Sequence, residues 1–302
     1  MNGEQVCIVG EVGSNYDGDL GLAKQYVRAC QQAGADAVKF QTLRRDRIVA
    51  PYIESNGQLV ENPSYGLFAS LELDAEWHYE LKKTADEVGI EFLSTPFYLE
   101  AVDLLESVGV STYKIASGDI TFFPLLERVG QTGKNVLLST GASSLQDVEQ
   151  ALDTLVSAGA GEVTLLHCVS NYPPEWAEMN LRAIVTMKEV FDLPVGISDH
   201  SPGSLVPIAA VALGAELIEK HVTFDRASPG PDHPFAMTID ELEHMVQQVR
   251  HLQQALGTGE KIPTETELAK QKRIRRGTYD WETKEPIDDS DGIWLRPEHT
   301  SS

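Results

Sequence analysis

The chain has 302 residues, of which 46 are acidic and 24 basic, and its formal net charge is -22. Such an acidic chain is poorly suited to bind nucleic acid or an anionic membrane surface. Its three cysteines, Cys7, Cys30 and Cys168, are widely spaced and odd in number, so they indicate neither a disulfide framework nor a zinc knuckle. We find no signal peptide and no apolar run of membrane length, so a cytoplasmic enzyme is the expected class.

Short apolar runs alternate with helical patterns along most of the chain. Asp74 and Gly89 are expected to begin and end one helix, and the segment Gln41–Ser70, which shows no clear period, is expected to be a long loop. The apolar runs predict strands over Val6–Val9, Ala37–Phe40, Glu91–Ser94, Thr112–Ile115, Val136–Ser139, Val163–His167, Val195–Ser198 and Leu217–Lys220. The helical patterns cover Leu20–Ala33, 74–88, Leu99–Val108, Pro124–Val129, Leu145–Ala158, Asn180–Val190, Ser204–Leu213 and Asp240–Leu256.

Eight consecutive β/α units predict an α/β fold, a closed (β/α)8 TIM barrel. An open doubly wound sheet is the alternative, but it would usually carry a glycine-rich dinucleotide turn after its first strand. The segment GEVGSNYDG follows that strand and lacks the G-x-G-x-x-G spacing, so a nicotinamide or flavin site is not expected. We assign residues 1–260 to the barrel, and residues 261–302 form a tail too short for a second full core.

Two histidines, His200 and His221, follow the last two predicted strands. The carboxyl ends of barrel strands meet on the rim that carries the active site, so both imidazoles are expected there. Neutral histidines that face each other can hold a divalent metal, although a single strand-end histidine is more often an ordinary polar residue. The segment SPGPDHP shortly after His221 favours a site.

Lysines and hydroxyl groups follow the other predicted strands. This combination suits a ligand with a phosphate and a carboxylate, although one strand-end lysine alone would more simply be solvated or ion-paired. Cys168 is expected to be buried rather than nucleophilic, because it neighbours His167 on a strand and adjacent residues point to opposite faces. The side chains expected on the rim are Glu11, Asn15, Tyr16, Lys39, Gln41, Ser94, Thr95, Lys114, Ser117, Asp119, Ser139, Thr140, His167, Ser170, Tyr172, Ser198, Asp199, His200, Lys220 and His221.

Nine motifs appear in order: GEVGSNYDG, GADAVKFQT, FLSTPF, YKIASGD, LLSTGAS, LLHCVSNYPP, LPVGISDHS, LIEKHVTFD and PGPDHPFAM. Together they resemble the sialic acid synthase family, which makes N-acetylneuraminate and related nonulosonates from phosphoenolpyruvate. The resemblance implies a (β/α)8 barrel followed by a small antifreeze-like domain, with active sites shared across a homodimer. It also implies a synthase that condenses phosphoenolpyruvate with an N-acetylmannosamine-type sugar, releases phosphate and uses Mn²⁺ or Mg²⁺.

The resemblance further implies a role for each matching residue. Glu11 and Asp119 would lie at the reacting centre, and His200 and His221 would bind the divalent ion. Phosphoenolpyruvate would be held by Lys39, Thr95, Lys114, Ser117, Ser139 and Ser198. The sugar would contact Tyr172, Asp232 and, from the tail, Arg296.

Two features depart from the family pattern. Tyr16 stands where the family commonly has histidine, and the tail is about half as long as the antifreeze-like domain, which indicates either a reduced domain or a natural truncation. Other interpretations are a different phosphoenolpyruvate–aldose condensing barrel, or a non-catalytic barrel that binds a sugar or a metal. A phosphorylated sugar would need a further anion site, and we see no spare arginine cluster on the rim. The retained Glu11, lysines and histidines argue against a non-catalytic protein.

Overall fold

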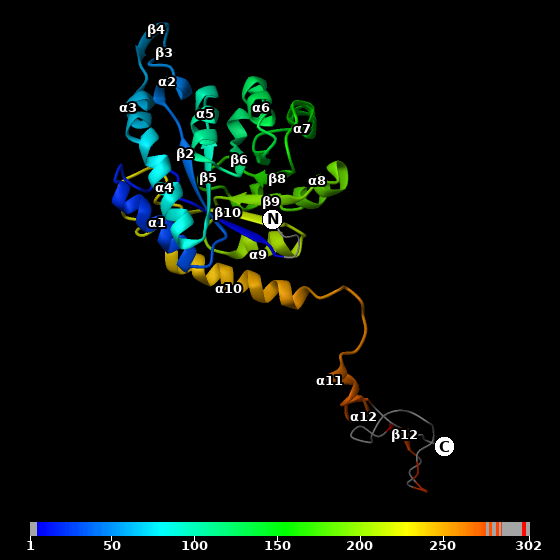
Figure 1. The fold of residues 1–302 in the computed structure, drawn as a ribbon. Helices are drawn as coiled ribbons and strands as arrows, with labels where there is room; N and C mark the ends of the chain where they lie inside the picture. The colour runs from blue at the N-terminus through cyan, green and yellow to red at the C-terminus, as the bar shows by residue number, and fades with distance from the viewer. Residues whose placement is uncertain (1–4, 276–277, 280–281, 284, 286–297, 300–302) are drawn as a thin grey trace. The chain divides into compact units, whose positions relative to one another are not determined.

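The computed structural model describes residues 5–275, 278–279, 282–283, 285 and 298–299. Eight parallel strands form the barrel sheet in the order β1-β2-β5-β6-β7-β8-β9-β10, and β10 pairs with β1 to close the barrel (Figure 1). A ninth strand of two residues, β11 (Met237–Thr238), also pairs with β10. The (β/α)8 barrel predicted from the sequence is therefore confirmed. The strands are β1 (Cys7–Glu11), β2 (Ala37–Thr42), β5 (Glu91–Pro96), β6 (Thr112–Ile115), β7 (Asn135–Ser139), β8 (Val163–Cys168), β9 (Val195–Asp199) and β10 (Leu217–Thr223).

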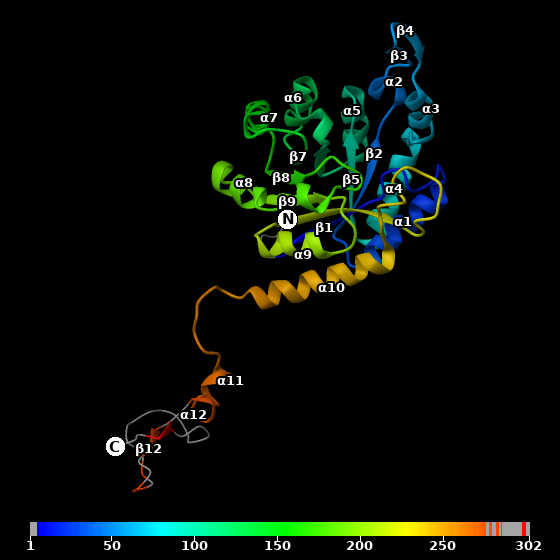
Figure 2. The same ribbon diagram turned by 180° about the vertical axis from the view of Figure 1, so that it is seen from behind.

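Helices follow the strands and surround the sheet (Figure 2). Helix α4 (Ala75–Val88) begins where the Asp74 side chain accepts a hydrogen bond from the Glu76 amide at 2.8 Å. It ends at Gly89, whose φ of 75° is strained for any residue with a Cβ, so both predicted ends are confirmed. The other helices of the barrel are α1 (Leu20–Gln32), α5 (Leu99–Val108), α6 (Phe123–Gly130), α7 (Leu145–Ala158), α8 (Ala183–Phe191), α9 (Leu205–Ala212) and α10 (Ile239–Leu256).

The segment predicted to be a long loop contains regular structure instead. It folds into α2 (Arg45–Ile48), an antiparallel hairpin of β3 (Tyr52–Ser55) and β4 (Gln58–Glu61), and α3 (Pro63–Ser70). The hairpin projects beyond the barrel helices (Figures 1 and 2). Every residue of both strands is exposed, so no alternation of apolar and polar residues marks them in the sequence, and for this reason the prediction was wrong.

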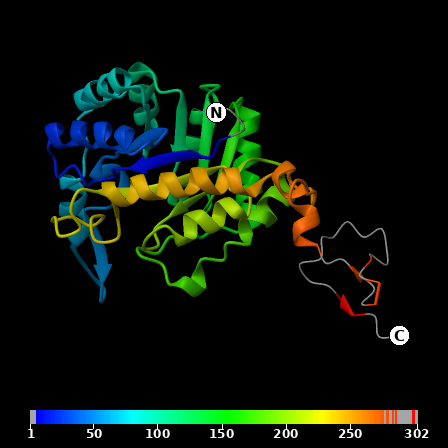
Figure 3. The same cartoon turned by 90° about the horizontal axis from the view of Figure 1, so that it is seen from below.

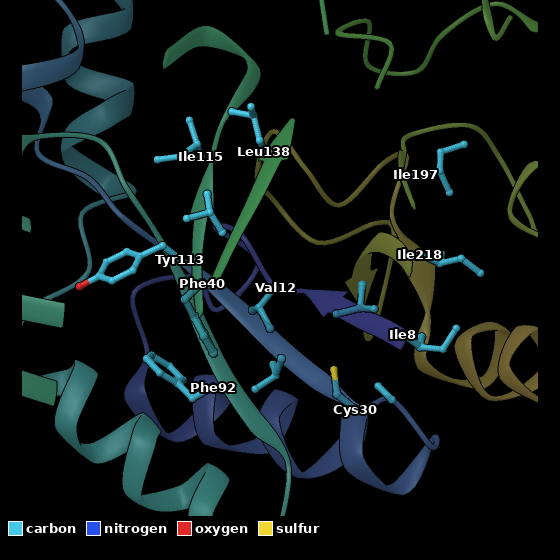
Figure 4. Close-up of a cluster of buried hydrophobic side chains, with 14 of the residues drawn as sticks. Ile8, Val12, Cys30, Phe40, Phe92, Tyr113, Ile115, Leu138, Ile197 and Ile218 are labelled. Carbon is cyan, nitrogen blue, oxygen red and sulfur yellow. The ribbon is translucent and has the colours of Figure 1, made fainter. Parts of the chain in front are cut away.

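Two apolar clusters lie on opposite faces of the barrel wall. The outer cluster fills the space between strands and helices and includes Ile8, Phe40, Phe92, Ile197 and Ile218 (Figure 4). Because successive strand residues point to opposite faces, residues one position away on the same strands point inward. The inner cluster consists of Cys7, Val9, Ala37, Leu93, Leu137, Leu166 and Leu217. These side chains plug the lumen, so the barrel is a packed core rather than a pore.

Helix α10 lies alongside α1 and α9 and buries Leu242, Met245, Val246 and Val249 in the outer cluster (Figure 3). The chain divides into two compact units, Met1–Ala255 and Leu256–Ser302. The described elements of the second unit are α11 (Glu265–Leu268), α12 (Gln271–Ile274), β12 (Thr278–Tyr279) and β13 (Glu298–His299), of which β12 pairs with β13. Among the helices built from described residues, none is long and apolar enough to cross a membrane.

Candidate active site

A pocket of about 550 Å³ opens at the carboxyl ends of the barrel strands. All eight strands, or the loops that follow them, contribute to its wall. The pocket brings together most of the residues singled out from the sequence: Glu11, Lys39, Thr95, Lys114, Ser117, Asp119, Ser139, Ser170, Tyr172, Ser198, His200 and His221.

The polar floor of the pocket lies directly above the apolar plug in the lumen. On β1, Val9 belongs to the plug and Glu11, two residues later, lines the pocket. On β7, Leu137 and Ser139 are related in the same way. Since side chains two positions apart on a strand share a face, each strand supplies one apolar layer and then one polar layer. Regular strand geometry thus positions this polar floor, and the loops after the strands add the rest of the site.

Two lysines and two carboxylates form a buried network on this floor. Lys39 Nζ lies 2.7 Å from Glu11 Oε2 and donates to Thr95 Oγ1 at 3.1 Å. Lys114 Nζ donates to Glu219 Oε1 at 2.9 Å, and Lys39 Nζ lies 3.8 Å from Glu219 Oε2. Burial opposes charge on Glu219, but Lys114 and Lys39 hold the pKa of Glu219 well below its usual range. The lysines are therefore held in place as ion pairs beneath the pocket.

Hydroxyl groups surround the two lysines. Ser198 Oγ donates to Glu219 Oε1 at 2.8 Å, and Ser117 Oγ accepts a hydrogen bond from the Gly141 amide at 2.9 Å. A Cβ on Gly141 would lie 2.7 Å from Ser117 Oγ and would also collide with Ser170 Oγ, so glycine is required for this approach. Ser139 Oγ is buried and has no hydrogen-bond partner among the described residues, which leaves a donor for a ligand.

The two histidines face each other on the other side of the pocket, with ring centroids 5.3 Å apart. Tyr172 packs on His200 at 4.3 Å between ring centroids, and Phe235 packs on His221 at 5.1 Å. Burial holds the pKa of His200 well below its usual range, so this ring is neutral. Nδ1 of each histidine is buried and lacks a hydrogen-bond partner within the described structure.

This donor set fits a divalent metal held by two protein ligands. A buried nitrogen without a partner is costly, and a neutral imidazole with an open nitrogen is the form that binds metals. The nearest carboxylate is that of Asp232, whose Oδ2 lies 3.9 Å from His221 Nδ1. In the described part of the chain, no group of three or more His, Cys, Asp or Glu side chains forms a fuller site. An ion here would therefore keep coordination positions for other ligands.

Asp232 lies behind His221, in the loop that follows β10. Its Oδ2 accepts a hydrogen bond from Ser14 Oγ at 2.8 Å, which joins this loop to the loop after β1. Gly13 permits the contact, because a Cβ there would lie 2.8 Å from Asp232 Oδ2 and its φ is 56°. The next residue, His233, is buried between Thr223 Oγ1 at 2.8 Å and Asp17 Oδ1 at 3.1 Å. The loop that carries Asp232 is thus anchored on both sides.

Asp119 is the last residue of a 3-10 turn, Ser117–Asp119, that follows β6. Its carboxyl group lines the pocket, and burial raises the pKa of Asp119 to about 6. A carboxyl group with such a pKa exchanges its proton near neutral pH, which is a useful property for acid–base chemistry. Arg296, the remaining residue predicted to contact the sugar, lies outside the described residues.

Several residues expected on the rim do not face the pocket. His167 points outward, where its Nε2 donates to the Met179 carbonyl at 2.7 Å, whereas Cys168 lines the pocket wall. Cys168 is buried, as expected, and burial raises the pKa of its thiol. Lys220 also points outward and forms a buried ion pair with Asp199 on the neighbouring strand. Alternation along β8, β9 and β10 explains all four placements.

Tyr16 belongs to the core rather than to the site. Its ring lies against Phe40 and Trp77, at centroid distances of 6.1 Å and 6.5 Å, and its hydroxyl donates to the Leu71 carbonyl at 3.1 Å. The expectation that Tyr16 faces the rim is therefore wrong. Its side chain instead turns toward α4 and the end of α3, where a hydroxyl has a carbonyl partner.

Two charged residues of the pocket were missed in the sequence. Glu219 could have been found from its spacing, since it lies two positions before His221 on β10 and shares its face. Arg47 gave no such signal, because it lies on α2 within the segment taken for a loop. It lines the mouth of the pocket and forms an ion pair with Glu100 at 2.9 Å. This single guanidinium is already paired, so it does not form the spare arginine cluster that we expected to be absent from the rim.

Comparison with known proteins reveals relatives along most of the chain. The NeuB family model matches residues 26–261. An N,N'-diacetyllegionaminic acid synthase of Legionella pneumophila is 41% identical over 302 residues, which cover 96% of this chain and 85% of the relative. An uncharacterized protein of Methanocaldococcus jannaschii is 42% identical over 287 residues, or 92% and 82% of the two chains. The crystal structure of an N-acetylneuraminic acid synthetase from Leptospira borgpetersenii superimposes with a TM-score of 0.81 and 34% identity, covering 88% of this chain and 90% of that chain.

Proposed function

Because the chain belongs to the NeuB family, we propose that it is a metal-dependent synthase that condenses phosphoenolpyruvate with an N-acetylmannosamine-type sugar. The product would be a nonulosonic acid, and phosphate would be released. The names of the relatives support this proposal, since they are synthases of legionaminic and N-acetylneuraminic acids. We also propose that the active form is a homodimer.

One observation carries the proposal. Two lysines that are ion-paired with carboxylates line the same pocket as two histidines whose Nδ1 atoms lack hydrogen-bond partners in the described structure. Lys39 and Lys114, with the surrounding hydroxyls, would bind the phosphate and carboxylate of phosphoenolpyruvate. His200 and His221, which line the same pocket, would hold the divalent ion. An anion site or a metal site alone would fit many barrels, but both in one pocket suit a reaction between an anionic enol and an aldehyde.

The side chains support the following division of work. C3 of the enol would form a bond to the aldehyde carbon, water would add at C2, and the C2–O bond to phosphate would break. Bound Mn²⁺ or Mg²⁺ would supply Lewis acidity at the aldehyde oxygen. Glu11, beside Lys39, would take the proton of the attacking water, and Asp119, which also lines the pocket, would donate a proton to the oxygen that was the aldehyde carbonyl. The lysines and Ser117, Ser139 and Ser198 would hold the enol with its C3 directed at the aldehyde carbon.

Phosphate release tests the activity. The protein is incubated with phosphoenolpyruvate, Mn²⁺ and, in turn, each of a panel of N-acetylated hexoses and phosphorylated aldoses. We expect phosphate release that depends on an N-acetylated hexose, together with a new acid detected by mass spectrometry. Release only with a phosphorylated aldose would replace the proposal with another phosphoenolpyruvate–aldose condensation. Binding of ligands without any phosphate release would favour a non-catalytic barrel.

Metal binding has a test that does not depend on turnover. Free Mn²⁺ gives an electron paramagnetic resonance signal that decreases when the ion binds to the protein. We expect His200→Ala and His221→Ala each to abolish high-affinity Mn²⁺ binding, since each removes one of two protein ligands. His244→Ala is the matched control, because that histidine is exposed on α10 and hydrogen-bonded to Asp240. Unchanged Mn²⁺ affinity in both histidine variants would place the metal elsewhere.

A further inference from the structure

The two histidines of the pocket lie at the same level of two neighbouring strands. β9 pairs with β10 in parallel, and Asp199 lies opposite Lys220 in the register. His200 follows Asp199 directly, and His221 follows Lys220, so both histidines occupy the next level of the pair. The distance between the imidazoles therefore depends on how the two strand ends are held together.

Hydrogen bonds do not orient the two imidazoles. Nδ1 of each ring is buried and lacks a partner among the described residues, and Asp232 Oδ2 lies 3.9 Å from His221 Nδ1. A histidine that binds a metal usually has its other ring nitrogen held by a carboxylate or a carbonyl group. Here the positions of the rings depend on aromatic packing and on the backbone that carries them.

A buried polar cluster on the outer face of the barrel joins the two strand ends. Lys220 Nζ donates to Asp199 Oδ2 and to the Ser201 carbonyl. The Ser201 amide donates to Asp199 Oδ1 at 2.9 Å, and the Ser201 hydroxyl donates to Asp199 Oδ2 at 3.0 Å. Each of the three residues is at most 2% exposed. We call Asp199, Ser201 and Lys220 the outer clamp.

The outer clamp encloses the backbone of His200. Asp199 precedes this histidine and Ser201 follows it, and both bind one ammonium group, which belongs to the residue before His221. The side chains of the clamp point away from the pocket, because adjacent residues on a strand point to opposite faces. The clamp can therefore fix the two histidines without filling space that a ligand needs.

Stability does not explain a buried ion pair at this place. Two positions earlier on the same strands, Ile197 and Ile218 lie opposite each other in the outer apolar cluster (Figure 4). An apolar pair could fill the level of Asp199 and Lys220 as well, and such a replacement of a buried ion pair is often neutral or stabilising. Buried ionic groups that are kept despite their desolvation cost are best known for fixing one arrangement of chain segments.

From these contacts we propose that Lys220 is a positioning residue. With Asp199 and Ser201 it sets the distance and orientation of His200 relative to His221, and thereby the affinity of the histidine pair for a divalent ion. Lys220 itself contacts neither the ion nor a substrate. This inference rests on the proposed function, which assigns a divalent ion to the histidine pair.

A double substitution tests the clamp without leaving one buried charge alone. Asp199→Asn with Lys220→Met removes both charges, and the amide oxygen can still accept the hydrogen bond from the Ser201 amide. We expect Mn²⁺ affinity, measured by electron paramagnetic resonance, to fall by roughly tenfold to a hundredfold, the range usual for residues behind metal ligands. Affinity for phosphoenolpyruvate, titrated without Mn²⁺, should stay unchanged, since Lys39 and Lys114 lie on β2 and β6.

The matched control is Lys188→Met with Glu216→Gln. Lys188 Nζ donates to Glu216 Oε1 at 2.6 Å and to the Gly214 carbonyl at 2.9 Å, so this pair also joins an ammonium group to a carboxylate and a carbonyl. It lies at the amino end of β10, whereas His221 lies near the carboxyl end. We expect wild-type Mn²⁺ affinity in this control.

Thermal unfolding separates positioning from general stability. A fall in Mn²⁺ affinity, while the Tm of the metal-free double variant stays close to the wild-type value, supports the proposal. Unchanged Mn²⁺ affinity overturns it, and so does an equal loss of affinity for Mn²⁺ and phosphoenolpyruvate, which would indicate a distorted barrel. Lys220→Met alone is expected to be much less stable, because it leaves the Asp199 carboxylate buried without its partner.

Failure of the proposed function is distinguishable from failure of the clamp. If the wild-type protein binds no Mn²⁺, the metal site is refuted, and nuclear magnetic resonance of isotope-labelled histidine rings then tests the clamp directly. His200→Ala and His221→Ala assign the two ring signals. We expect both signals to shift in the clamp variant and neither to shift in the control variant. Signals that keep their positions in the clamp variant refute the clamp.

Discussion

Glu219 is the residue through which the two lysines of the pocket are coupled. Its Oε1 accepts hydrogen bonds from Lys114 and Ser198, and its Oε2 lies 3.8 Å from Lys39. A charged lysine is therefore positioned before any ligand enters, and less side-chain entropy is lost on binding. The same buried carboxylate would be left without its partner if either lysine were removed.

The lysines are the residues whose loss should most directly weaken phosphoenolpyruvate binding. Lys39→Met and Lys114→Met each remove a charge-assisted hydrogen bond, which is worth about 1.5–3 kcal/mol. We expect a corresponding loss of phosphoenolpyruvate affinity in titration calorimetry for each variant. Lys134→Met is a suitable control, since that lysine pairs with Glu106 on the outer surface. Wild-type affinity in both pocket variants would mean that the anion binds elsewhere.

Asp119 makes stability depend on pH. Burial raises the pKa of Asp119 to about 6 in the folded state, whereas an unfolded aspartate titrates near about 3.9. The folded state binds the proton more tightly, so the free energy of unfolding falls as pH rises from about 4 through about 6. Asp119→Asn removes this penalty, and we expect it to raise Tm at about pH 8 and to have much less effect at about pH 4.

Thermal unfolding at the two pH values measures this difference. Asp153→Asn, on the exposed face of α7, serves as the control and should show no such dependence. An equal Tm shift at both pH values in Asp119→Asn would show that the carboxyl group does not carry the penalty. Carboxyl groups whose pKa is raised by burial are common in active sites, where the acid takes part in catalysis.

At the level of elements, the loops after β1 and β10 act as one unit. Ser14 donates to Asp232 from both its hydroxyl and its amide, and Asp17 binds His233, so three hydrogen bonds cross between the loops beside the histidine pair. Thr223, at the end of β10, completes the anchor through His233 Nδ1. The loop that carries Asp232 is thus fixed by a buried imidazole rather than by packing alone.

Thr223→Val tests this anchor with almost no change of shape. It leaves His233 Nδ1 buried without a partner, which should lower the free energy of unfolding by about 1–3 kcal/mol. This change displaces Asp232 and leaves Lys39 and Lys114 in place. We therefore expect KM for the sugar to rise while phosphoenolpyruvate affinity stays unchanged. Thr154→Val, which removes a hydrogen bond on the surface of α7, is the control. A parallel loss of affinity for both substrates would contradict the assignment.

The last prediction concerns the whole molecule, in which the tail of one chain is expected to complete the site of another. The family resemblance predicts that Arg296, outside the described residues, contacts the sugar bound by a partner subunit. If so, mixed dimers of Arg296→Ala and Glu11→Ala chains should contain one intact site and recover part of the activity that each variant lacks. We would form them by co-expression and measure phosphate release. No recovery, or a fully active monomer in sedimentation, would refute a shared site.

The sequence alone determined the repeating β/α pattern, the ends of helix α4 and the strand ends that carry the candidate site. These features are local: a strand needs only its apolar residues, and a helix end needs only a capping residue such as Asp74 or a glycine such as Gly89. The lysines and histidines could be placed on one rim, because closing a parallel barrel brings all the carboxyl ends of its strands together.

Tertiary structure decided which side chains face that rim and which partners they meet. Lys220 and His167 lie at strand ends like Lys39 and His221, but their strand positions point to the outer face. The hairpin after β2 could not be anticipated, since it buries neither face. The packing of Tyr172 on His200 and of Phe235 on His221 exists only because the fold brings the loops after β8, β9 and β10 together. The local sequence pattern specifies each helix and strand, whereas contacts between distant segments specify the pocket and the partners of its side chains.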